Sequence, residues 1–142
     1  MAVVTIFWLL FMSRTVHAPH STSETLNLTM TSGEQEYVKN IQVGNIAMSR
    51  AENFLHQEVT ILNGEVYNAG KEPVYGLRLT TTYSDDMNQT VLKETRAVLG
   101  SPEPPLAPGE RRTFEISFDH VPNSWNMQQP SVAVAYLRLR RR

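Results

Sequence analysis

The chain has 142 residues, 13 basic and 14 acidic side chains, a formal net charge of −1 and no cysteine. This length supports one domain, and a domain of about 120 residues can fold without disulfides or a structural metal. The balanced charge argues against nucleic acid as the main partner, and the lack of cysteine leaves the cellular compartment open.

The N-terminal segment is hydrophobic. Residues 2–12 read AVVTIFWLLFM and are apolar apart from one threonine. The run is too short to span a bilayer, which takes about 20 residues, but it suits the apolar region of a secretory signal. Val16 and Ala18 occupy the positions that a signal peptidase reads, whereas Arg14 follows the run and no basic residue precedes it. We therefore expect residues 1–18 to be a signal peptide or a truncated membrane anchor. The remaining chain is then extracytoplasmic, either periplasmic or membrane-anchored.

The next segment, residues 19–36, is predicted to be a linker or an extended arm. It begins with small and polar residues, and Leu26, Leu28 and Met30 then alternate with polar ones, which is the period of a half-exposed strand. The folded domain is expected over residues 37–142.

The first half of the domain has the periodicity of β-strands. Within residues 37–48 the apolar side chains change phase at Gly44, which predicts a β-bulge there. Residues 58–68 and 74–83 also alternate, and a turn lies between them. These two segments are predicted to form a hairpin.

One short helix is predicted before that hairpin. Ser49 and Glu52 have the spacing of a capping box. Three apolar side chains would share one side of the helix that follows: Ala51, Phe54 and Leu55. Residues 50–56 are therefore predicted to form one or two helical turns over an end of the core.

The second half of the domain is divided by a proline-rich loop. Residues 101–110 contain four prolines and a glycine, so they cannot form a central strand and suit a crossing between two sheets. Residues 91–98 precede this loop as a less regular segment, and residues 114–118 and 132–139 follow it as strands. Six or seven short strands with Gly and Pro in their connections predict an all-β fold, an immunoglobulin-like antiparallel β-sandwich.

Three motifs follow one another in a characteristic order. They are GEVYNAG at residues 64–70, the strand at 74–83, and LAPGE at 106–110 ahead of Phe114. This order, over residues 58–119, resembles the FxLYD-like group of bacterial domains. The resemblance implies an immunoglobulin-like sandwich, often placed behind a signal peptide or membrane anchor, that acts as a non-enzymatic envelope module and brings no catalytic residues.

Residues that could carry out chemistry are few. None of the four histidines has a partner at metal-ligand spacing, and no G-x-S-x-G motif occurs, so we expect no enzyme, no metal and no cofactor. Asp85 and Asp86 are adjacent acids in a turn, which are usually turn formers. The six methionines suggest a periplasmic copper carrier as the alternative, because thioether and imidazole groups suit Cu(I). A hydrolase ranks third.

Two features are candidates for interaction. Trp125 is of a residue type that is enriched at binding hot spots, although in a turn at the end of a sandwich it can instead plug the core. The chain also ends in a group of arginines that either meets anionic lipid headgroups or protects a solvated strand end: Arg138, Arg140, Arg141 and Arg142. The sequence as a whole predicts a non-enzymatic binding or structural module at the cell envelope. Its partner is an unknown protein, and its N-terminus is the expected route to the membrane.

Overall fold

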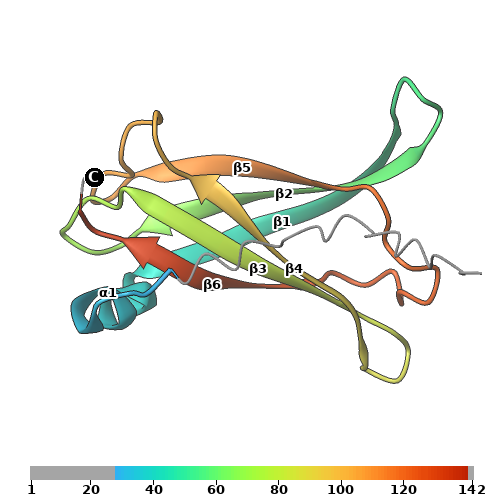
Figure 1. Ribbon diagram of the computed structural model, residues 1–142, viewed down its shortest axis with the longest axis horizontal. Coiled ribbons are helices and arrows are strands. Elements are labelled where there is room, and N and C mark those ends of the chain that lie inside the picture. Colours follow the sequence, from blue (N-terminus) through green and yellow to red (C-terminus); the bar gives the residue numbers. More distant parts are fainter. Residues whose placement is uncertain (1–27, 141–142) are drawn as a thin grey trace, which may run out of the picture.

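A computed structural model describes residues 28–140, which form a sandwich of two antiparallel sheets (Figure 1). One sheet has the strand order β1-β2-β5 and the other has the order β4-β3-β6. The elements are α1 (Ser32–Tyr37), a 3₁₀ helix (Val38–Asn40), β1 (Ile41–Glu52), β2 (Glu58–Asn68), β3 (Gly76–Ser84), β4 (Thr90–Leu99), β5 (Arg111–Phe118) and β6 (Ser131–Arg138). The predicted all-β, immunoglobulin-like sandwich is confirmed. The signal or anchor expected at residues 1–18 lies outside the described residues.

The connections between strands correct one prediction and confirm another. β2 pairs with β1 and β5, whereas β3 pairs with β4 and β6, so the predicted hairpin of β2 and β3 is wrong. Both edges of β2 are already occupied, and residues 69–75 therefore carry the chain to the other sheet. The proline-rich loop at residues 101–110 does cross between the sheets, from β4 to β5, as its composition predicted.

The helix predicted at residues 50–56 is also wrong. β1 continues to Glu52, and its last residues pair with the start of β2, with Arg50 opposite Thr60. The capping box forms instead at Thr31 and Glu34, where the hydroxyl accepts from the Glu34 amide (3.2 Å) and the carboxylate accepts from the Thr31 amide (2.9 Å). Strand pairing outweighs the local helix signal at residues 49–52, where a neighbouring strand is present.

Helix α1 lies within the segment that was expected to be a linker, and it packs on the sandwich. The Glu34 carboxylate is buried and accepts a hydrogen bond of 2.8 Å from the amide of Leu139, just beyond β6. Burial alone would raise the pKa of this carboxyl. The hydrogen bonds from the amides of Thr31 and Leu139 outweigh burial and hold it below its ordinary value. The packed part of the chain thus begins before residue 37.

The bulge predicted at Gly44 is confirmed. The pairing of β1 with β2 shifts register between Gly44 and Ala47, and Asn45 takes a left-handed φ of 52°. Asparagine tolerates this conformation better than most residues. The shift lets both halves of β1 direct apolar side chains toward the core.

The core lies between the sheets and is built from alternating residues of each strand. β5 buries Phe114, Ile116 and Phe118, as its alternation predicted. The ring of Tyr83 packs edge-on against Phe118 and Trp125, with centroid separations of 5.1 Å in both cases. Such aromatic pairs contribute more than their buried area alone.

Asn68, at the end of β2, is completely buried and makes several hydrogen bonds. The side-chain oxygen Oδ1 of Asn68 accepts hydrogen bonds from the Tyr37 hydroxyl (2.7 Å) and the backbone amide of Gly70 (3.1 Å). The side-chain NH₂ group donates to the backbone carbonyls of Glu72 (2.7 Å) and Leu106 (3.1 Å). The single side chain therefore joins the helical segment, the connection after β2 and the proline-rich loop.

Replacing Asn68 by leucine should lower the free energy of unfolding by about 3 kcal/mol or more. The variant leaves several buried groups without a partner, each at a cost of about 1–3 kcal/mol. Urea denaturation followed by circular dichroism measures the change. Asn63→Leu is the matched control, because Asn63 lies on the same strand and its side chain has no hydrogen bond to the described residues. An equal decrease in the free energy of unfolding in both variants would show that the hydrogen bonds of Asn68 make no special contribution to stability.

Candidate functional site

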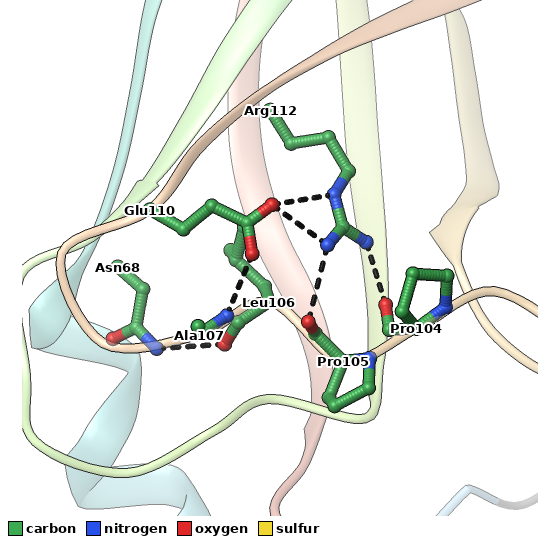
Figure 2. A network of polar contacts seen from close by, with 7 residues as sticks. All are labelled: Asn68, Pro104, Pro105, Leu106, Ala107, Glu110 and Arg112. Atoms are coloured by element: carbon green, nitrogen blue, oxygen red, sulfur yellow. Dashed lines mark hydrogen bonds and ion pairs between the residues drawn. The ribbon is translucent and has the colours of Figure 1, made fainter.

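The first cluster of polar side chains surrounds the proline-rich loop (Figure 2). One carboxylate oxygen of Glu110 accepts from the Ala107 amide (2.9 Å), and the other accepts from Nε (3.0 Å) and Nη2 (2.7 Å) of Arg112. Arg112 also donates to the carbonyls of Pro104 (2.7 Å) and Pro105 (3.1 Å). The side chains of Glu110 and Arg112 bond to each other and to backbone groups of the proline-rich loop. This cluster therefore stabilises the loop and is not a candidate ligand site.

The same hydrogen bonds lower the pKa of the Glu110 carboxyl. The hydrogen bond from Ala107, followed by that from Arg112, holds the pKa of Glu110 below its ordinary value of 4.5. Beside it, Gly109 takes a left-handed φ of 77° and donates to the carbonyl of Asn68 (2.7 Å). The loop is therefore held to β2 at the point where the chain changes sheets.

The opposite end of the sandwich exposes apolar side chains. Three loops lie at this end, at residues 53–57, 85–89 and 119–130; the first and the second project to opposite sides, and the third lies between them (Figure 1). Among the described residues, four large hydrophobic side chains are strongly exposed, and all four lie in these loops: Phe54 (91% exposed), Leu55 (63%), Met87 (80%) and Met127 (59%). These four residues are called the apolar loop end. They come from three separate parts of the chain, and only the fold brings them to one end.

The loops at this end are connected to one another. The Asn126 amide donates to the carbonyl of Ser84 (2.9 Å), and Arg50 donates to the sulfur of Met127 (2.8 Å). Asp85 accepts from the amides of Met87 (2.9 Å) and Gln89 within its own turn, which is the turn-forming role expected of it. The apolar side chains are thus carried by hydrogen-bonded turns.

The charge around the apolar loop end is acidic. Within residues 50–58, 84–90 and 118–131 there are five carboxylates and one arginine, Arg50. Arg50 itself pairs with Glu58 at 3.2 Å, and His56 at the tip of the first loop pairs with Glu52. This end therefore presents exposed apolar side chains with an acidic border.

Trp125 lies beneath these loops, in the core. It is 7% exposed, and its indole N–H donates to the carbonyl of Gln128 at 3.0 Å. The tryptophan therefore plugs the end of the sandwich, which is the second of the two roles considered for it. Trp125 also lines a neighbouring hollow of about 560 Å³, together with His120 and Met127.

The arginines near the C-terminus do not form one patch in the part of the chain that is described. Arg138 is half-buried on β6 and donates to the carbonyl of Tyr75 (3.3 Å), whereas Arg140 is exposed. Arg138 lines a groove of about 550 Å³ on the outer face of the β4-β3-β6 sheet, beside Arg78 and Tyr136. Arg141 and Arg142 lie outside the described residues.

Residues 28–140 contain no group of three or more His, Cys, Asp or Glu side chains placed to hold a metal ion. In the same range no helix is both long enough and apolar enough to cross a membrane. Comparison of the chain with protein-family models, curated proteins and solved structures found no match.

Sequence reasoning missed the apolar loop end. Phe54 and Leu55 were assigned to a helix face, where they would have been half-buried, and Met87 and Met127 carried no pattern. The available signal was that residues 53–57 lie between two β-patterned segments, which makes a hairpin tip an alternative to a helix.

Replacing Glu110 by glutamine should cost about 1 kcal/mol of stability at pH 7, because charge-assisted hydrogen bonds are lost. A carboxyl whose folded-state pKa is depressed contributes stability above its unfolded pKa. It loses that contribution as the pH falls through the folded pKa. The stabilities of the wild type and Glu110→Gln should therefore converge below pH 4.5. Urea unfolding at pH 7 and pH 3.5 measures both.

Glu103→Gln is the control for this experiment. Glu103 lies in the same loop, is exposed, and its carboxylate has no hydrogen bond to a described residue. A gap between the wild type and Glu110→Gln that stays constant with pH would contradict the assignment.

Proposed function

We propose that this chain is a non-enzymatic binding module at the cell envelope that contacts a protein partner through its apolar loop end. The observation that carries the proposal is that the four strongly exposed large hydrophobic side chains of the described residues all lie in the loops at one end of the sandwich: Phe54, Leu55, Met87 and Met127. Single exposed hydrophobic residues are ordinary, but their restriction to the loops at one end of a β-sandwich supports an interaction role for that end. Exposed apolar side chains in water are unfavourable unless a partner covers them for part of the time.

The charge at this end indicates the chemistry of the partner. The five carboxylates around the apolar side chains disfavour an anionic membrane, which would repel them. They favour a protein surface with an apolar pocket bordered by lysine or arginine. Phe54, the most exposed of the four, is the side chain that such a pocket would receive.

The placement outside the cytoplasm is part of the same proposal. It is supported by the hydrophobic N-terminal sequence and by the motif order that resembles the FxLYD-like domains. Helix α1, through which the chain enters the described domain, lies at the end opposite the apolar loop end (Figure 1). An attachment through the N-terminus would therefore leave the loops free to meet a partner.

Photo-crosslinking in cells tests the partner. Benzoylphenylalanine placed at position 54 should give discrete protein adducts in the envelope fraction, and adding Leu55→Ser should reduce their yield by about tenfold, since a buried leucine contributes roughly 1.5–3 kcal/mol. The probe at position 71, in the exposed loop after β2 at the opposite end, is the control and should give none of these adducts.

Identical adducts from positions 54 and 71 would overturn the use of the loop end. Recovery of the full-length chain from the cytoplasm would overturn the placement. Binding to vesicles of zwitterionic or anionic lipid that depends on Phe54 would assign the apolar loop end to a membrane instead.

A second candidate is a periplasmic copper carrier. His120 and Met127 border the same hollow, and imidazole with thioether suits Cu(I). The sulfur of Met127 accepts a hydrogen bond from Arg50 in this structure, so a metal would have to displace that contact.

Titration with Cu(I) against a chromophoric competitor tests the carrier. If the site exists, Met127→Leu and His120→Gln should each weaken binding at least tenfold, whereas Met48→Leu, on β1, should not. No binding at micromolar copper rules this function out.

A further inference from the structure

A groove of about 550 Å³ lies at the end of the sandwich that carries α1, on the outer face of the β4-β3-β6 sheet. Its volume falls within the range found for small-molecule sites, about 300–1,000 Å³. The start of β3 and the end of β6 form its floor, and the proline-rich loop forms a wall. The lining residues that bear on recognition are Tyr75, Arg78, Pro102, Glu103, Tyr136 and Arg138.

Two arginines on the floor of this groove are close neighbours. Gly76 pairs with Arg138 and Arg78 pairs with Tyr136, so the two arginines lie diagonally across the β3–β6 pair on the same face of the sheet. The side chain of Arg138 lies over Gly76, where an added Cβ would be 3.5 Å from Nε and 3.6 Å from Cζ. The Arg138 guanidinium therefore lies close to the sheet, at the floor of the groove.

The positive charge of this pair is not balanced by an ion pair within residues 28–140. Three arginines elsewhere on the strands pair with a glutamate: Arg50, Arg96 and Arg112. Arg78 and Arg138 have no such partner in the described chain. Arg138 is half-buried, and its Nε is buried with no acceptor among the described atoms. A partly buried cation is unfavourable unless an anion compensates it, so the floor favours an anionic group.

The wall of the groove is apolar and is held in place from behind (Figure 2). Arg112 donates to the carbonyls of Pro104 (2.7 Å) and Pro105 (3.1 Å). Prolines have no backbone N–H, so this wall presents apolar surface and few donors. Glu103, an exposed carboxylate, also lines the groove and lowers the positive charge of the lining from two to one. A wall that is already ordered reduces the entropy lost when a ligand binds.

We infer that this groove binds a small organic anion. Its carboxylate or phosphate group lies between Arg78 and Arg138, and its apolar part lies against the prolines and Tyr136. Guanidinium groups recognise both kinds of oxyanion through paired N–H donors. The charge of the lining fits one anionic group and not a polyanion. The groove is separate from the apolar loop end, which lies at the other end of the sandwich (Figure 1).

NMR titration of the full chain in detergent solution tests the site, with benzoate and phenyl phosphate as probes. Amide signals of residues 76–78 and 136–138 should shift, with a dissociation constant below about 1 mM. Arg78→Gln should weaken binding at least about tenfold, because it removes a charged donor. Arg96→Gln is the matched control. Arg96 lies on the same sheet but pairs with Glu94 and does not line the groove, so this variant should bind as the wild type does.

Two comparisons separate the charge from the apolar surface without depending on a variant of the floor. Benzamide, which has no charge, and inorganic phosphate, which has no apolar part, should each bind at least about tenfold more weakly than the probes. Glu103→Gln should strengthen binding about two- to threefold, because it removes a negative charge beside the anion.

The proposal is overturned if neither probe shifts these signals at millimolar concentration, or if benzamide binds as tightly as benzoate. It is also overturned if Arg78→Gln, folded as judged by urea denaturation, binds as tightly as the wild type. Binding of only one of the two probes supports the site and identifies its anion as a carboxylate or a phosphate. Crosslinking from position 54 uses the other end of the domain, so the two proposals can fail separately.

Discussion

The buried amide of Asn68 is the contact on which the arrangement of the two sheets depends. It lies where β2 ends, and at that point the chain must leave the first sheet. Its four hydrogen bonds hold Tyr37, the turn after β2 and the proline-rich loop in one cluster. A buried primary amide is costly unless it is satisfied, so these segments have to meet in one arrangement. At the end of the domain that carries α1, three segments of the chain are therefore joined by one buried side chain.

The apolar loop end is the opposite case. There the turns satisfy their own backbone, as Asp85 does, and the hydrophobic side chains are left in water. Trp125 closes the core behind them and packs edge-on against Tyr83. The tryptophan supports the loops from within, and the exposed side chains lie outside it. The buried polar contacts around Asn68 and the exposed apolar side chains thus lie at two different ends of one sandwich.

The sequence predicted what is local and missed what depends on pairing. The alternation of residues 114–118, the bulge at Gly44 and the crossing at the proline-rich loop each follow from a short stretch of chain. The partners of β2 do not, because a strand pattern does not say which strand lies beside it. Residues 31–34 and 49–52 both have capping-box spacing, and only pairing with β2 keeps the second an extended strand. The apolar loop end could not be predicted from the sequence for the same reason, since only folding brings its three loops to one end of the sandwich.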